Sequence, residues 1–181
     1  MKSIYNDLSW SFLVASPSFS GPFFEEAVIL LLEDNEDGSF GVIVNKPTGK
    51  TLGELGSEFE NELACVEVFD GGPVSPEHVS LAICSESGKN EGAFSFGVPP
   101  EKALEILKKD STAKIAAFAG YTSWGPNQLQ GEINEGTWIV SNADIDAMLS
   151  LSSKELWKHA ILKEMKQFEG LQEPENPPEL N

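Results

Sequence analysis

The chain has 181 residues, of which 40% are hydrophobic and 23% charged, and its formal net charge is −17. This length favours one domain, since domains commonly hold about 100–200 residues, and it is ample to bury a core without metal ions or cross-links. The composition excludes an intrinsically disordered chain, and the longest apolar run, 27–32, is far shorter than the roughly 20 residues that cross a bilayer.

The charge argues against a nucleic-acid-binding protein. There are 29 acidic residues against 12 basic ones, and every basic residue is a lysine. Arginine is the residue that forks onto phosphates and guanine edges, and a strongly negative protein repels nucleic acids at long range. We therefore expect no direct contact with DNA or RNA.

The N-terminus and the cysteines indicate a cytoplasmic protein. The first twelve residues contain no apolar segment typical of a signal peptide. Cys65 and Cys84 form neither a C-x-x-C pair nor a metal-ligand spacing. We expect a reduced cytoplasmic protein, away from membranes, with no metal site and no cofactor.

Apolar runs rich in β-branched and aromatic residues predict the strands. They lie at 11–16, 27–33, 40–45, 65–70, 79–84, 94–97, 114–120 and 137–140. The sequence DNEDGS separates the second run from the third and predicts a hairpin turn. Because both of these runs are apolar on both faces, we expect an antiparallel pair at the centre of the sheet.

Helices are fewer and lie mostly in the second half. Segments 100–110 and 126–133 each begin with a proline, which is favoured in a first helical turn. Asn142 is expected to cap a helix over 143–151, and Ser152 with Glu155 forms a capping box before a helix over 152–168. Without regular β-α alternation the fold class is α+β. We expect one domain over 5–170, followed by a disordered, acidic, proline-rich tail over 171–181.

Four segments in this order carry a family resemblance. They are 12–47 (with N-K-P at its end), VFDGGPV at 68–74, GYTSWGPNQLQGEI at 120–133, and the closing WIV and LWKHAI. From Asp7 to about Phe168 the chain resembles the AlgH/YqgE family of bacterial proteins. The resemblance implies a single compact α+β domain with a branched, mostly antiparallel or mixed sheet folded into a pseudo-barrel. It implies no agreed biochemical activity, and members are labelled transcriptional regulators.

Several catalytic patterns fail on their spacing. Ser123 lacks the G-x-S-x-G elbow of a hydrolase nucleophile, and the two cysteines fall in predicted strands, where a free cysteine acts as a small hydrophobe. PTGKT at 47–51 resembles the end of a phosphate loop, but Val44 stands where the first glycine is required.

A pocket at strand ends is the remaining candidate site. Glycine, polar and aromatic residues follow three predicted strands, a place where ligand sites are commonly built. The candidate ligand-binding residues are Asn45, Lys46, Gly71, Gly72, Tyr121, Trp124 and Gln128. The favoured alternative is structural, with tight turns and rings packed into the core, because Gly/Pro clusters mark turns more often than sites.

Two functions follow. The preferred one is a non-enzymatic regulatory or scaffolding protein that acts through an unknown protein partner or small molecule, including indirect control of transcription. The alternative is a small-metabolite binder or enzyme that uses the pocket of Asn45, Lys46, Gly71, Gly72, Tyr121 and Trp124. The sequence favours no catalytic residue, and it sets no oligomeric state.

Overall fold

The structure is a computed structural model that describes residues 7–19, 21–56, 59, 62–84 and 94–170. Within these residues the strands are β1 (Ser11–Ala15), β2 (Val28–Asn35), β3 (Gly38–Ile43), β4 (Pro47–Thr51), β5 (Glu67–Asp70), β6 (Val74–Cys84), β7 (Phe94–Phe96), β8 (Lys114–Trp124) and β9 (Trp138–Asn142). The helices are α1 (Leu52–Leu55), α2 (Pro100–Lys109), α3 (Gln128–Asn134), α4 (Ile145–Ser150) and α5 (Ser153–Gly170). No helix among the described residues is long and apolar enough to span a membrane.

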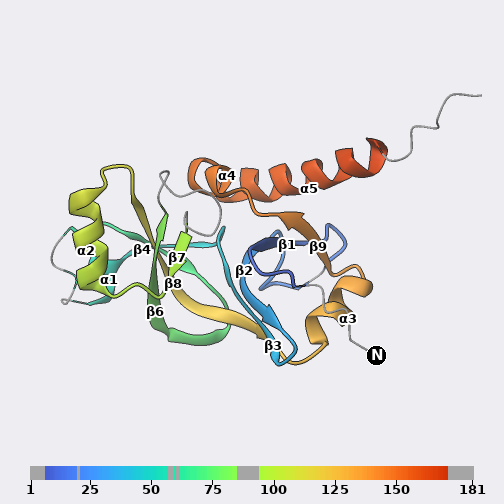
Figure 1. Ribbon diagram of the computed structural model, residues 1–181, viewed down its shortest axis with the longest axis horizontal. Helices are drawn as coiled ribbons and strands as arrows, with labels where there is room; N and C mark the ends of the chain where they lie inside the picture. The colour runs from blue at the N-terminus through green and yellow to red at the C-terminus, as the bar shows by residue number, and fades with distance from the viewer. Residues whose placement is uncertain (1–6, 20, 57–58, 60–61, 85–93, 171–181) are drawn as a thin grey trace, which may run out of the picture.

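One mixed sheet joins all nine strands. Its main path runs β4-β5-β8-β3-β2-β1-β9, and β6 branches from β8 and carries β7 on its other edge. Strands β5 and β8 are parallel, whereas the other described pairs are antiparallel. The predicted α+β fold with a branched, mixed sheet is confirmed, and the path is open at β4 and β9, so the sheet is not closed into a barrel (Figure 1).

Strands β2 and β3 form the central antiparallel hairpin that the sequence predicts. Asn35 pairs with Gly38 across a two-residue turn, and the Asn35 side-chain oxygen accepts a hydrogen bond from the Asp37 N–H at 2.9 Å. Gly38 has a φ of +144°, a conformation that side chains disfavour. The turn therefore fixes the register of the hairpin.

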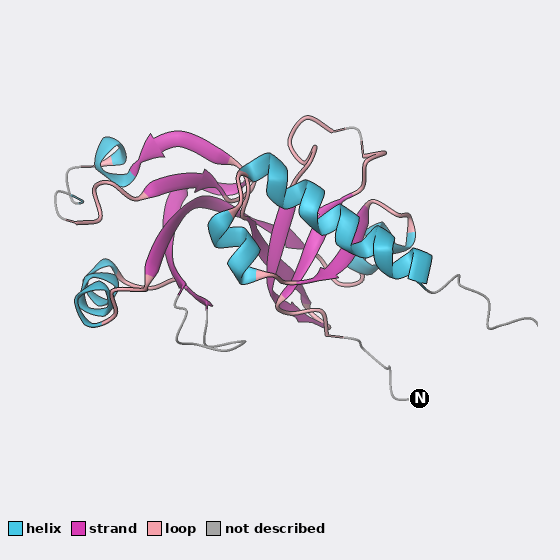
Figure 2. Cartoon of the chain, turned by 90° about the horizontal axis from the view of Figure 1, so that it is seen from above, coloured by secondary structure: helices cyan, strands magenta, loops and turns pink. Residues whose placement is uncertain are grey.

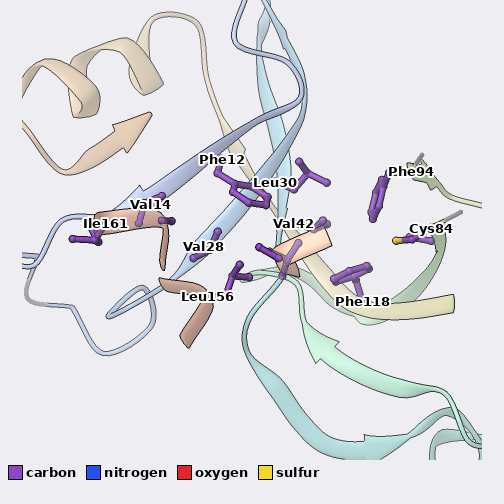
Figure 3. Close-up of a cluster of buried hydrophobic side chains, with 14 residues drawn as sticks. Phe12, Val14, Val28, Leu30, Val42, Cys84, Phe94, Phe118, Leu156 and Ile161 are labelled. Carbon is purple, nitrogen blue, oxygen red and sulfur yellow. The ribbon is translucent and has the colours of Figure 1, made fainter. Parts of the chain in front are cut away.

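Two helical layers explain why these strands are apolar on both faces. Helices α4 and α5 cover one face of the β1-β2-β3-β9 part of the sheet, while α3 packs on the other (Figures 1 and 2). Phe12 and Val14 of β1 belong to the cluster with Leu156 of α5 (Figure 3). Leu13, between them in sequence, belongs to the cluster with Leu129 of α3. A strand buried on both sides needs no apolar–polar alternation.

The remaining part of the sheet has its own core. Helices α1 and α2 pack against β5, β6 and β8 through a cluster that includes Leu52, Ala103 and Ala117. Strand β8 belongs to both parts of the sheet. Its residues 117–119 lie between β5 and β6, and its residues 122–124 pair with β3. The change of partner takes place around Gly120.

Several element boundaries differ from the sequence predictions. Strand β8 continues through Trp124, so Tyr121 to Trp124 are strand residues, and β4 was not predicted. Helix α4 is capped by Asp144, whose side chain accepts from the Ala147 N–H, and not by Asn142. Cys65 is exposed and precedes β5, so its predicted place in a buried strand is wrong. Residues 5–6 of the predicted domain and the predicted tail over 171–181 lie outside the described residues.

Candidate functional site

The segment from Trp124 to Gln128 connects a strand to a helix through a tight turn. Trp124 ends β8 with a 7% exposed side chain, and Asn127 takes the left-handed conformation at φ +62° before α3 begins. The Gln128 side-chain oxygen accepts a hydrogen bond from the Gly125 N–H at 3.0 Å. Gln128 thus fixes the turn and also starts the helix that faces Trp124.

The carboxylate of Glu132 joins this segment to β9. Its Oε2 accepts hydrogen bonds from the indole N–H of Trp124 at 2.8 Å and from that of Trp138 at 2.7 Å. Its Oε1 accepts a bond from the Gln128 amide at 3.0 Å, since Gln128 and Glu132 are one helical turn apart. One carboxylate therefore fixes two indole rings that come from distant parts of the chain.

A cavity of about 380 Å³ opens beside these rings. We call it the tryptophan cavity, and its walls include Phe19, Phe24, Trp124, Trp138, Gln128 and Glu132. The ring planes of Trp124 and Trp138 are nearly perpendicular, at 86°, with centroids 6.2 Å apart. Phe24 also meets Trp138 edge to face, at 5.6 Å, so aromatic rings bound the cavity in more than one direction. Its volume lies within the usual range of ligand pockets, about 300–1,000 Å³.

Asn45 and Lys46 line a different depression. This Lys46 hollow, about 590 Å³ in volume, is also lined by Glu26, Asp70 and Lys154, and it shares no lining residue with the tryptophan cavity. The Lys46 ammonium group donates to the Glu25 carbonyl oxygen at 2.5 Å.

The amide of Asn45 is occupied by the protein itself. Its oxygen accepts from the Val28 N–H at 2.7 Å, and its nitrogen donates to the carbonyl oxygens of Glu26 at 2.8 Å and Ser153 at 3.0 Å. Because the side chain is only 4% exposed, it acts as a buried link between β2 and the start of α5.

Gly71, Gly72 and Tyr121 line neither of these two depressions. The glycines lie against β8, where a β-carbon on Gly72 would come within 2.2 Å of the Tyr121 carbonyl. Tyr121 faces the α5 side of the sheet and packs on Phe40 with ring centroids 5.0 Å apart. The structure therefore groups Trp124 with Gln128 and Asn45 with Lys46, and it separates the two pairs.

Glu132, Trp138, Phe19 and Phe24 were missed by the sequence reasoning. The available signal was the one-turn spacing of Gln128 and Glu132 behind Trp124, which places both polar side chains next to that ring. The contributions of Trp138, Phe19 and Phe24 depend on long-range packing, for which the sequence carries no local signal.

The reactive groups are dispersed. Burial raises the pKa of the Cys84 thiol to about 12, which keeps it protonated. His78 pairs with Glu77 and His159 with Asp144, so neither described histidine is bonded to Ser123. Residues 47–51, which resemble part of a phosphate loop, form strand β4.

Comparison with known proteins shows the relatives of this chain. The sequence pattern of the AlgH-like family matches residues 12–168. A UPF0301 protein of Streptomyces coelicolor is 32% identical over 170 residues, which cover 88% of each chain. Another, of Streptomyces avermitilis, is 30% identical over 187 residues, covering 97% of this chain and 96% of the relative.

Two solved structures share the fold. The solution structure of the AlgH protein from Pseudomonas aeruginosa superposes with a TM-score of 0.68 at 20% identity, covering 98% of this chain and 100% of that one. A crystal structure of a protein from Corynebacterium diphtheriae gives a TM-score of 0.69 at 23% identity, covering 90% of each. With a family match that spans nearly the whole described chain, the protein belongs to the AlgH-like family.

Proposed function

We propose that this protein is a cytoplasmic regulatory protein that binds a small ligand in the tryptophan cavity without converting it. The observation that supports this most is the pair of indole rings fixed by Glu132 around a cavity of about 380 Å³. A site whose walls are held in place before the ligand arrives loses little free energy to ordering on binding. Ligand binding would regulate the protein if its contact with a partner differed between the ligand-free and ligand-bound forms.

The groups around the cavity favour binding over chemistry. Its described lining residues include no histidine, cysteine or lysine, and Glu132 is the only titratable side chain among them. That carboxylate already accepts three hydrogen bonds. The Thr122 hydroxyl donates to the Gly41 carbonyl oxygen at 3.0 Å, which ties it to the sheet. General acid–base catalysis needs a group that is free to take or give a proton near the substrate.

The Lys46 hollow supports the alternative, an enzyme or metabolite binder with a polar site. Two lysines and two carboxylates line it. The hydrogen bonds of Asn45 and Lys46 to backbone groups argue for a structural role for both side chains, so this hollow is the second candidate.

A thermal-shift screen against a metabolite library tests the proposal. The screen is repeated on Trp124→Phe, which keeps a ring but loses the indole N–H, and on Lys46→Ala. We expect a ligand whose shift is lost in Trp124→Phe and kept in Lys46→Ala. Mass spectrometry of the ligand after incubation should recover it unchanged. The opposite pattern in the two variants, or a converted ligand, would instead support the enzyme at the Lys46 hollow.

A further inference from the structure

Four aromatic side chains are among the residues that line the tryptophan cavity. Trp138 lies at the centre of the aromatic group, with Trp124 and Phe24 nearly perpendicular to it and Phe19 nearly parallel, at 26° and 5.9 Å. Aromatic faces attract a cation placed within about 6 Å of the ring centre, and tryptophan does so most strongly. The hydrogen bonds of both indoles to a carboxylate polarise the rings in the direction that favours a positive guest.

Glu132 supplies the matching negative charge. A carboxylate can accept about four hydrogen bonds. Here two go to the indoles and one to Gln128, so the protein's own bonds leave acceptor capacity on Oε1. No lysine is among the described lining residues to neutralise the carboxylate. The fold therefore holds the negative charge of Glu132 beside the cavity, and no lining lysine offsets it.

The field of the whole molecule acts in the same direction. With a net charge of −17, the chain attracts cations and repels anions over roughly a Debye length. An anionic metabolite would meet this repulsion and then the Glu132 carboxylate, whereas a cation would be favoured at both stages.

We propose that the tryptophan cavity binds a trimethylammonium group. This inference rests on the proposed binding function and names the ligand class. A primary ammonium is strongly hydrated and needs several acceptors to replace its water. A trimethylammonium carries its charge on apolar methyl surface, which suits a cavity that four aromatic side chains line. Such a group occurs in free choline-like molecules and in trimethylated lysine side chains.

Calorimetric titration of the full chain with matched probes tests the charge. Choline is compared with 3,3-dimethylbutan-1-ol, which has the same shape without the charge. We expect choline to bind at least about tenfold more tightly, because only the charged probe gains from the rings and from Glu132. Equal affinities, or no heat with choline, would overturn the cation proposal. This comparison uses the unaltered protein and does not depend on how any variant folds.

Variants then assign the interaction to the cavity. Glu132→Gln keeps the shape of the side chain and removes its charge, so choline affinity should fall about tenfold. Glu135→Gln removes a charge just beyond α3, outside the described lining, and should leave the affinity within about twofold. Equal losses in both variants would mean that choline senses only the overall charge, which contradicts a site.

A third probe identifies the source of the group. Acetylated and amidated trimethyl-lysine is titrated beside choline. Tighter binding of choline indicates a free small molecule, and tighter binding of the lysine derivative indicates a modified protein side chain. The library screen can distinguish failure of this inference from failure of the proposed function. A neutral or anionic ligand whose thermal shift disappears in Trp124→Phe would support the binding function and contradict the proposal of a cationic ligand.

Discussion

Three glycines allow the sheet to branch. Gly120 has a φ of +71° at the point where β8 changes partner, and a β-carbon there would lie 2.3 Å from the Gly72 carbonyl oxygen. Gly71 would meet the Gly120 carbonyl oxygen at 2.4 Å. The two backbones are in direct contact at a place where any side chain would hold them apart. Close packing therefore explains the glycines of the Gly-Gly-Pro segment without a ligand.

Replacing Gly72 by alanine should therefore damage the fold. Gly72 has a φ of +150°, which side chains disfavour, and a β-carbon there would lie 2.2 Å from backbone atoms of Tyr121. Backbone atoms cannot move aside as the end of a flexible side chain could. We expect a loss of about 3 kcal/mol or more in the free energy of unfolding, measured by urea denaturation.

Gly131→Ala is the matched control for this change. It lies within α3, its β-carbon would meet nothing within 4 Å, and it should stabilise the protein by about 0.5–1 kcal/mol. A Gly72→Ala protein as stable as the parent would contradict the close backbone crossing.

Asn45→Asp is expected to weaken the link between the sheet and α5. The change replaces two N–H donors by an oxygen that would face the carbonyl oxygens of Glu26 and Ser153 in a buried place. The expected cost is about 3 kcal/mol in urea denaturation at pH 7. Asn134→Asp, an exposed site whose oxygen accepts from Gln130, should change stability by no more than about 0.5 kcal/mol. Similar costs at both sites would remove the structural role assigned to Asn45.

Local chemistry in the sequence located two of the six residues named as walls of the tryptophan cavity. Trp124 and Gln128 were found because a strand end followed by Gly-Pro and a polar side chain is a recognisable pattern. Glu132 and Trp138 were missed because a glutamate on a helix surface usually faces water, and only the packing of α3 against β9 makes it the partner of two indoles. The sequence also predicts Asn45 in this pocket, because it follows a strand end as Trp124 does, but the two residues line separate depressions.

Elements were predicted best where burial is two-sided. The β2-β3 hairpin followed directly from its apolar runs and turn residues. Gly120 and the Gly-Pro after Trp124 predict an end of strand β8 at residue 120, whereas the pairing with β3 extends the strand across the glycine to Trp124. Strand β4 is exposed along most of its length and has little apolar signal. Its partner β5, and not its own composition, makes it a strand.

The cap of α4 gives a pH-dependent prediction. The Asp144 carboxylate accepts a hydrogen bond from the Ala147 N–H at 2.9 Å. This bond contributes most to holding the pKa of Asp144 below its ordinary value of 3.8, and the hydrogen bond with His159 and the charge of Lys163 act in the same direction. A carboxyl with a lowered pKa stabilises the folded state above its unfolded pKa, and this contribution is lost as the pH falls through the lowered value. Asp144→Ala should cost about 1 kcal/mol at pH 7.

Asp144→Asn separates the cap from the charge. Asparagine caps helices as well as aspartate does, so this variant should be more stable than Asp144→Ala at pH 7. Its remaining deficit against the parent should shrink below about pH 4 in urea denaturation, as the parent carboxyl becomes protonated. A deficit that is constant from pH 7 to pH 3 would show that the charge of Asp144 contributes nothing.

The two parts of the molecule should unfold together. Strand β8 is shared, and one core cluster contains Phe12 of β1 together with Cys84 of β6 and Phe94 of β7. All four tryptophans pack in the two clusters around β1, and none is in the cluster under α1 and α2. Tryptophan fluorescence therefore reports unfolding of the part of the sheet around β1, whereas far-UV circular dichroism reports unfolding of the whole molecule. We expect coincident urea transitions, and a second transition seen only by dichroism would indicate two independently folding units.

The charge of the whole molecule predicts that any effect on transcription is indirect. A protein that grips DNA needs cations gathered on one face to neutralise phosphates. The densest lysines are on α5, where Lys154 also lines the Lys46 hollow and Lys163 donates to the Asn142 carbonyl oxygen, with Glu155 and Glu164 among them. A few lysines so distributed cannot offset the repulsion between DNA and a body of net charge −17.

We expect no sequence-specific binding in fluorescence-anisotropy titrations with promoter DNA at about 0.15 M salt, with a known DNA-binding protein as positive control. Submicromolar binding that survives competitor DNA would overturn this prediction.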